Sequence, residues 1–147
     1  MAITIALEIP NADVVAYDID PSALNVARSN NAALHSNVSF SQRNLFDGED
    51  TIFNVIVANL PYVSASQDVS PETLFEPKLA LLADNDGLEL ILLLIAQIHD
   101  KKLVVDNGYL ILESEPRQHA RIKRFAKAHK FRLRQTVGFI QLYQINY

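Results

Sequence analysis

Two polar residues stand directly after apolar runs and carry side chains that can bind a nucleoside and an amide. Asp18 closes a β-branched and aromatic run, and its two carboxylate oxygens match the paired hydroxyls of a ribose. Asn59 closes a second apolar run and offers both an acceptor and a donor. Pro61 then fixes a turn without adding an N–H, and Tyr62 adds an aromatic wall. The segment 59–62 therefore suits a planar amide or amino group, whose nitrogen it would position against an electrophile.

Each of these signals also has a purely structural explanation. Asp18 and Asp20 could simply cap the helix that follows them, although Asp20 before Pro21 can do this alone. Asn and Pro are ordinary turn-forming residues, so the four residues 59–62 taken alone favour a simple turn. Whether they form a site depends on what the rest of the chain adds.

The composition limits the chemistry that is available. The chain has 147 residues, a globular balance of 49% hydrophobic and 20% charged residues, and no cysteine. A disulfide framework, a thiolate metal site and a thiol nucleophile are therefore excluded, and we expect no metal centre. Only four glycines occur and the first is Gly48, so no glycine-rich phosphate loop can lie near residue 1.

The charge is unevenly distributed along the chain. The formal net charge is −4, yet eight of the 13 Lys and Arg residues fall between Arg117 and Arg134, a window without Asp or Glu. A basic run on a helix is usually a solvated face, so we expect no direct nucleic-acid binding. The longest apolar run, residues 90–96, is too short to span a membrane, and residues 1–3 lack a basic leader. We therefore expect a cytoplasmic chain without membrane contact.

Alternating helices and strands are expected to position the polar residues. Periodicity and turn residues predict helices over 1–9, 20–35, 88–101 and 117–129, and strands over 13–18, 38–42, 53–58, 109–113, 131–136 and 139–145. The strand 53–58 reads as buried on both faces, and 103–105 as continuing or closing the third helix before an Asn107-Gly108 turn. Residues 63–86 are predicted to form a long loop.

This order predicts one α/β domain over residues 1–147. Its sheet would be mostly parallel, covered by helices on both faces, and would end in an antiparallel hairpin around Gly138. Ligands of such sheets bind at the carboxyl ends of the strands. Asp18, Asn44 and Asn59 would lie at those ends.

Several stretches together resemble the class I S-adenosylmethionine-dependent methyltransferases. They are 16–24 (AYDIDPSAL), 44–46 (NLF), 55–63 (VIVANLPYV), 75–81 (FEPKLAL) running on through 86–88 (DGL), and 108–113 (GYLILE). More narrowly, they are similar to the protein-glutamine N5-methyltransferases that modify peptide-chain release factors, in order and spacing over essentially the whole chain. Phe75-Glu76-Pro77 before Asp-Gly-Leu distinguishes that family from DNA adenine methyltransferases.

The resemblance implies a Rossmann-like fold and a binding site for S-adenosylmethionine. Asp18 would hold the ribose hydroxyls, and Ile19 would pack beside the adenine. Asn44 and Leu45 occupy the adenine-contact position of the family, and Asn59 borders the cofactor.

The resemblance also implies a catalytic turn. Asn59 and Pro61 would hold the amide of the substrate glutamine and Tyr62 would flank it, with Glu76 and Pro77 adjacent to the site. The protein substrate would be a peptide-chain release factor.

Three departures from the family pattern bear on activity. Leu60 replaces the first proline of Asn-Pro-Pro-Tyr, so the turn loses one fixed φ angle. Asn44 stands where an acidic residue is usual. The family's first strand, its glycine-rich loop and its preceding helical domain have no counterpart here, and that strand lies between those ending at Asp18 and Asn59. We therefore expect this chain alone to bind the cofactor weakly or not at all, to be inactive alone, and to be able to self-associate through unpaired strand edges.

Three functions are consistent with these observations. The first is a glutamine N5-methyltransferase. The second is a non-catalytic homologue that a partner or a swapped copy completes. The third is a nucleic-acid adenine N6-methyltransferase, which residues 59–62 and the basic window 117–134 would suit.

Overall fold

The computed structural model describes residues 1–64, 82–83 and 87–147, and these fall into two compact units. The N-terminal unit comprises residues 1–49 and the C-terminal unit residues 50–147. No helix in the described part of the chain is long and apolar enough to cross a membrane. Because the described residues divide into two units, the expected single domain over residues 1–147 stays a prediction.

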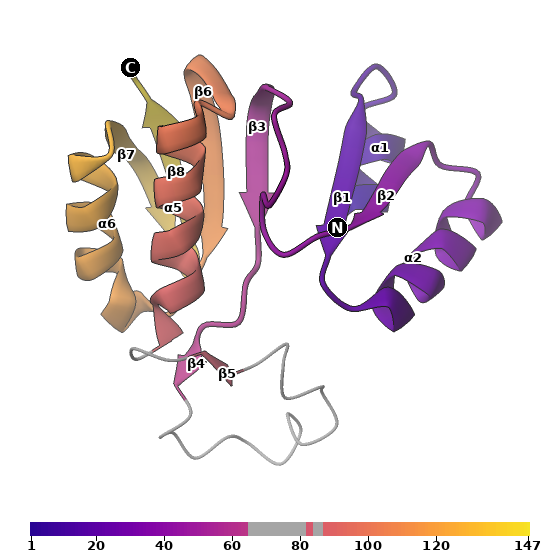
Figure 1. Ribbon diagram of the computed structural model, residues 1–147, viewed down its shortest axis with the longest axis horizontal. Coiled ribbons are helices and arrows are strands. Elements are labelled where there is room, and N and C mark those ends of the chain that lie inside the picture. The colour runs from indigo at the N-terminus through magenta and orange to yellow at the C-terminus, as the bar shows by residue number, and fades with distance from the viewer. Residues whose placement is uncertain (65–81, 84–86) are drawn as a thin grey trace. The chain divides into compact units, whose positions relative to one another are not determined.

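The N-terminal unit places two strand ends side by side. It contains α1 (Ala2–Glu8), β1 (Val14–Asp18), α2 (Pro21–Ala33) and β2 (Val38–Gln42). β1 and β2 are parallel, with Val14 opposite Val38 and Asp18 opposite Gln42, so both carboxyl ends lie at one edge (Figure 1). Asp20 caps α2 by accepting a hydrogen bond from the N–H of Ser22, as the sequence predicts.

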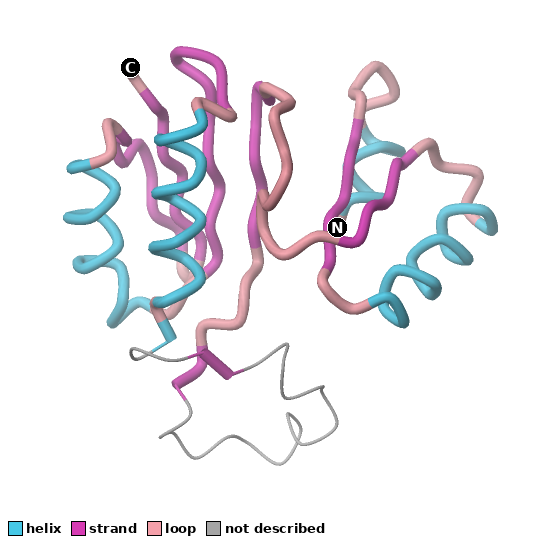
Figure 2. The backbone as a smooth tube through the Cα atoms, in the orientation of Figure 1, coloured by secondary structure: helices cyan, strands magenta, loops and turns pink. Residues whose placement is uncertain are grey.

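The C-terminal unit is built on a mixed four-stranded sheet (Figure 2). Its strands are β3 (Phe53–Ala58), β6 (Val104–Glu113), β8 (Ile140–Ile145) and β7 (Phe131–Val137), in that spatial order. β3 and β6 are parallel, whereas β8 is antiparallel to β6 and to β7. The predicted hairpin at the end of the chain is therefore confirmed. A short parallel pair, β4 (Val63–Ser64) and β5 (Leu82–Ala83), forms a separate small sheet.

Two helices cover one face of the four-stranded sheet. α5 (Glu89–Lys101) and α6 (His119–Ala128), which follows the 3-10 turn η2 (Pro116–Gln118), lie on the same side of it (Figure 1). α5 buries one apolar face at helical spacing, namely Ile91, Leu94, Ile95 and Ile98. In the strands every second side chain points to the helices, so that Leu110, Leu112, Tyr143 and Ile145 are buried beneath them. This layer is the core of the unit.

Three predictions about the C-terminal unit were wrong. Residues 104–105 belong to β6, because α5 ends at Lys102 in a left-handed conformation (φ 53°). Asn107-Gly108 lies within β6, where the register against β3 shifts. β3 is not buried on both faces, since Asn54 and Val55, which are consecutive and so point to opposite faces, are both exposed. The expectation that helices cover both faces of the whole sheet stays a prediction.

The expected α/β fold with an antiparallel end is confirmed, but its pairing has gaps within the described residues. β1 pairs with β2 and β3 pairs with β6, while the second edge of each has no described strand beside it. An unpaired edge presents backbone N–H and C=O groups to its surroundings. Self-association through these edges stays a prediction.

Candidate functional site

Asp18 lies at the exposed carboxyl end of β1, in a turn that orients its carboxylate. Its Oδ1 accepts a hydrogen bond of 2.9 Å from the N–H of Asp20. The turn is tied to the next strand, because the N–H of Arg43 donates to Asp18 O at 3.0 Å and Gln42 Nε2 donates to Ile19 O at 3.0 Å. Ile19 is 56% exposed, so its side chain is available to a flat ligand beside Asp18.

Asn44 and Leu45 begin the turn that follows β2, next to the end of β1. Asn44 is exposed, and Leu45 adopts a left-handed conformation with φ 49°. The turn closes on itself where the N–H of Asp47 donates to Asn44 O at 3.1 Å. The structure therefore brings the four predicted cofactor residues of the N-terminal unit to adjoining turns at one edge of its sheet.

A polar cluster behind these turns holds them in place. The hydroxyl of Tyr17 donates to the buried carboxylate of Glu49, which also lies 3.7 Å from Arg43. Arg43 crosses the ring of Tyr17 at 5.3 Å and donates to Asp47 O at 2.9 Å. Burial, together with the hydrogen bond to Glu49, raises the pKa of the Tyr17 hydroxyl to about 12. The hydroxyl is therefore protonated, and donates, throughout the neutral range.

An open cavity of about 270 Å³ adjoins Asp18 within the N-terminal unit. Its wall comes from both helices and both strands, and apart from Asn30 and the hydroxyl of Tyr17 its side chains are apolar: Met1, Ala2, Ile3, Ala16, Tyr17, Ala23, Leu24, Ala27, Asn30 and Phe40. Apolar walls beside a single carboxylate are typical of sites for small ligands that need one polar anchor. The carboxylate of Asp18, a hydrogen-bond acceptor at the end of β1, thus fits the hydroxyls of a ribose.

Asn59, Leu60, Pro61 and Tyr62 follow β3 directly in the C-terminal unit. Asn59 is exposed, whereas the other three are partly buried. The hydroxyl of Tyr62 donates to Glu113 Oε1 at 3.1 Å, and the carbonyl of Tyr62 accepts from Gln118 Nε2 at 2.8 Å. The segment 59–62 therefore begins with the exposed amide of Asn59 and ends at Tyr62, which is anchored by both its side chain and its backbone.

The predicted site residues fall into two groups. Asp18, Ile19, Asn44 and Leu45 belong to the N-terminal unit, and Asn59, Pro61 and Tyr62 to the C-terminal unit. Their union in a single site stays a proposal. Glu76 and Pro77, together with the distinguishing segment 75–77, lie outside the described residues.

Sequence reasoning missed the residues that hold the two groups. Glu113 carried a usable signal, because it is a polar residue at the end of a predicted strand, as Asp18 and Asn59 are. Gln118 had no such signal, because no sequence pattern around it predicts a hydrogen bond to the backbone of Tyr62. The role of Glu49 was equally hidden, because it depends on a contact with a tyrosine 32 residues away.

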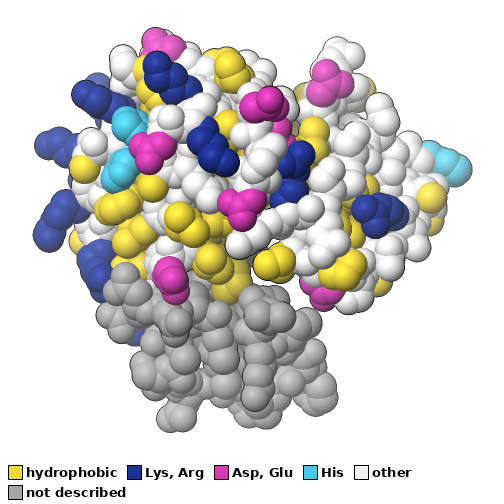
Figure 3. All heavy atoms as spheres, in the orientation of Figure 1, with side chains coloured by type: hydrophobic (Ala, Val, Ile, Leu, Met, Phe, Trp, Pro, Cys, Tyr) yellow, Lys and Arg dark blue, Asp and Glu magenta, His cyan; other side chains and the backbone are white. Residues whose placement is uncertain are grey.

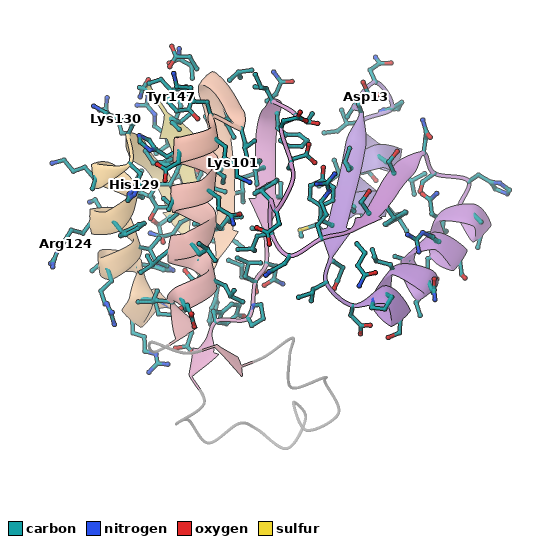
Figure 4. All side chains as sticks on the ribbon, in the orientation of Figure 1. Asp13, Lys101, Arg124, His129, Lys130 and Tyr147 are labelled. Carbon is teal, nitrogen blue, oxygen red and sulfur yellow. The ribbon has the colours of Figure 1, made fainter. Side chains whose placement is uncertain are left out.

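The basic window 117–134 lies on exposed surfaces of α6 and β7. Lys and Arg side chains line the edge of the molecule where α6 lies, and Arg124 and Lys130 point away from the sheet (Figures 3 and 4). Lys123, Arg124, Lys127, Lys130 and Arg132 are all exposed, and none of these side chains has a hydrogen-bond or ion-pair partner among the described residues. This basic face is consistent with the solvated surface that the sequence predicts.

Comparison with known proteins identifies relatives along most of the chain. The family model of a methyltransferase domain matches residues 1–131. The release factor glutamine methyltransferase of Deinococcus radiodurans is 37% identical over 119 residues, which cover 80% of this chain and 42% of that protein. The release factor glutamine methyltransferase of Rhodopirellula baltica is 40% identical over 123 residues, covering 79% and 41%. The chain thus spans about two fifths of these curated relatives.

Solved structures share the fold. A methyltransferase from Pyrococcus furiosus superposes with a TM-score of 0.72 at 17% identity, covering 98% of this chain and 68% of that one. A ribosomal protein L11 methylase from Lactobacillus delbrueckii superposes with a TM-score of 0.68 at 20% identity, covering 99% and 64%. At these identities the likeness concerns the arrangement of helices and strands.

Proposed function

The chain belongs to the methyltransferase domain family of class I S-adenosylmethionine-dependent enzymes, and on that premise we propose that it methylates the side-chain amide nitrogen of a protein glutamine. The acceptor we propose is a peptide-chain release factor. The observation that carries the proposal is the exposed amide of Asn59, which ends β3 in a turn anchored through Tyr62. The identity of 37–40% to two release factor glutamine methyltransferases supports the choice of acceptor.

The N-terminal unit provides the residues that would hold S-adenosylmethionine. Asp18 has a second carboxylate oxygen beyond the one bonded to Asp20, and would accept hydrogen bonds from the ribose hydroxyls. The exposed side chain of Ile19 would pack against the adenine, and Asn44 and Leu45 would contact its edge. When bound, S-adenosylmethionine supplies an electrophilic methyl group.

The C-terminal unit provides the residues that would hold the acceptor. The Asn59 side-chain oxygen and the Pro61 carbonyl would accept the two hydrogens of the glutamine amide, and Tyr62 would flank its plane. Two acceptors, one for each N–H, would fix the plane of the amide, and with it the direction of the nitrogen lone pair perpendicular to that plane. Asn59 is not a strong base, so these residues contribute orientation. The amide nitrogen would form its bond to the methyl group as the bond from that group to the cofactor sulfur breaks, and one amide proton would pass to solvent.

Methyl transfer can be measured with labelled S-adenosylmethionine and a release factor as acceptor. The assay would use the 147-residue chain and also a chimera in which the chain replaces the matching part of the Deinococcus radiodurans relative. The chimera supplies the remainder of a relative's structure, and so tests these residues in a complete setting. Label on a release-factor glutamine supports the proposal, whereas an unlabelled acceptor in both settings contradicts it.

Asn59→Ala gives the sharpest test of the catalytic turn. The variant should lower kcat at least about a hundredfold, because the acceptor amide loses a positioned hydrogen-bond partner in the transition state. The affinity for S-adenosylmethionine, measured by calorimetry, should change by less than about twofold. Equal losses of cofactor affinity and of rate would instead mean that Asn59 is structural.

A further inference from the structure

Three elements that come later in the chain converge on Tyr62. Gly87 lies just before α5, Glu113 ends β6, and Gln118 ends η2. Glu113 accepts the tyrosine hydroxyl, and Gln118 donates to the tyrosine carbonyl. Tyr62 is therefore held at the far end of its ring and at its backbone at the same time.

Gln118 is a fixed bridge rather than a surface side chain. It is 3% exposed, and both ends of its amide are engaged. Its Nε2 donates to Tyr62 O at 2.8 Å, while its Oε1 accepts from the N–H of Glu115 at 2.9 Å. Because one end of the amide must donate and the other must accept, the orientation of the group is determined.

Gly87 closes the space around the same carbonyl. A Cβ at this position would lie 1.9 Å from Tyr62 O and 2.7 Å from Gln118 Nε2, and the φ of Gly87 is +78°. The backbone of Gly87 and the amide of Gln118 thus both lie against this carbonyl. Rotation of the Tyr62 backbone would cost this hydrogen bond and meet Gly87.

This enclosure matters because the turn lacks a rigid second residue. Leu60 has a free φ angle, where proline would have a fixed one. A flexible turn would spread the Asn59 amide and the Pro61 carbonyl over several geometries. Because Tyr62 follows Pro61 directly, anchoring Tyr62 reduces the number of conformations that the turn can adopt.

We propose that Gln118 is a positioning residue for the acceptor amide: by clamping Tyr62 it holds the carbonyl of Pro61 and the amide of Asn59 in the geometry that grips the substrate. This proposal rests on the proposed function. Gln118 touches no substrate, and its effect passes through Tyr62. Glu113 is the second anchor of the same clamp.

Gln118→Leu removes the clamp and keeps the volume, and Gln141→Leu is its matched control. Gln141 is also a buried glutamine of the C-terminal unit, at 1% exposed, but it lies in β8. In the 147-residue chain, Gln118→Leu should move the Tyr62 carbonyl carbon resonance upfield, and Gln141→Leu should leave it unchanged. In the methyl-transfer assay, Gln118→Leu should lower kcat about tenfold, the effect of one lost hydrogen bond, with the cofactor affinity unchanged.

Leu60→Pro provides a rescue that a general loss of stability would not show. Added to Gln118→Leu, it should restore most of the lost kcat, because the ring supplies the rigidity that the clamp no longer gives. Added to the unaltered chain, it gives the reference kcat against which the rescue is measured.

Two results would overturn the proposal. One is a Tyr62 resonance that does not move in Gln118→Leu, and the other is a displaced resonance with an unchanged kcat. If the unaltered chain and the chimera transfer no methyl group, the proposed function fails and the positioning role fails with it. The Tyr62 resonance would then still show separately whether Gln118 holds the turn.

Discussion

Tyrosine hydroxyls donate to glutamate carboxylates in both groups of site residues, Tyr17 to Glu49 and Tyr62 to Glu113. The hydroxyl and the carboxylate are polar, yet the rings pack as apolar surface, so each pair can lie partly buried beside a turn. Phe46 packs edge-on against Tyr17 with their centroids 5.9 Å apart. At the level of single residues, the turns next to Asp18 and Asn59 are thus held by side chains that need not touch a ligand.

Tyr17→Phe should change how stability depends on pH above neutrality. The pKa of Tyr17 is about 12 in the folded chain and about 10 when unfolded, so its contribution to stability is fully present below pH 10 and is lost as pH rises from 10 to 12. Urea denaturation of the unaltered chain and the variant between about pH 8 and pH 12 measures this. The difference in unfolding free energy should shrink across that window. A constant difference would contradict the raised pKa.

Gln141→Leu should stabilise the chain by about 1 kcal/mol. Gln141 is buried, and its Oε1 has no hydrogen-bond partner among the described residues. Leucine of similar volume removes the cost of desolvating that oxygen. Chemical denaturation at neutral pH measures the change. A loss of more than about 1 kcal/mol would mean that the amide makes a hydrogen bond that leucine cannot replace, for example with the Tyr143 hydroxyl.

At the scale of elements, the junctions decide which residues the site receives. The N-terminal start of α5 brings Gly87 against Tyr62, and η2 brings Gln118 to the same carbonyl. Both contacts depend on the order in which β3, α5, β6 and α6 pack, so a substitution at a junction acts on the turn from a distance in sequence.

Gly87→Ala should destabilise the chain by about 3 kcal/mol or more, since a methyl group would meet the backbone of Tyr62 and the φ of +78° disfavours any side chain. Gly138→Ala is the matched control. Its φ is +55°, but nothing lies within 4 Å of the added carbon, so about 1 kcal/mol is expected. Thermal and urea unfolding compare the two variants. Equal losses would mean that the contact with Tyr62 relaxes freely.

The sequence predicts elements well where a local signal marks their ends. Asp20 and Pro21 start α2 as expected, and Gly138 turns the final hairpin. The end of α5 lacks such a signal, because Lys102 takes the left-handed conformation that glycine usually marks. The exposure of β3 could not be predicted from the sequence either, since it depends on what packs on the two faces of the strand and not on the apolar run itself.

At the scale of the whole molecule, the core is divided unequally between the units. Of the buried hydrophobic residues in the described part of the chain, only Leu24, Val38 and Phe46 belong to residues 1–49, and all the others belong to residues 50–147. Stability within one chain need not be uniform, and it follows local apolar burial. The binding role proposed for Asp18 and Asn44 therefore falls on the less buried unit.

Hydrogen exchange should show this difference. Amides of β1 and β2 should exchange through openings of lower free energy than amides of β6 and β8, which lie over the buried faces of α5 and α6. Exchange measured residue by residue at neutral pH tests this. Equal protection of the two strand pairs would mean that the units open together.

The methyltransferase fold as a whole was within reach of sequence reasoning, and the site only in part. Asp18 and Asn59 stand at strand ends, where a one-dimensional pattern reveals them. Gln118 acts through a contact 56 residues away, which no local pattern encodes. The distribution of the core was also hidden, because the apolar residues of β1 and β3 look alike in sequence but differ in what packs on them.

The basic face of α6 and β7 concentrates positive charge on one part of a chain whose pI is about 5.5. The charge that a nearby surface meets is therefore the local charge of the side that faces it, which can differ in sign from the net charge. At about pH 7.5 it should bind an anion exchanger through its acidic surfaces and yet also be retained by a cation exchanger through residues 117–134. Retention on a cation exchanger would therefore not follow from the net charge of the chain, and failure to bind that resin would contradict this expectation.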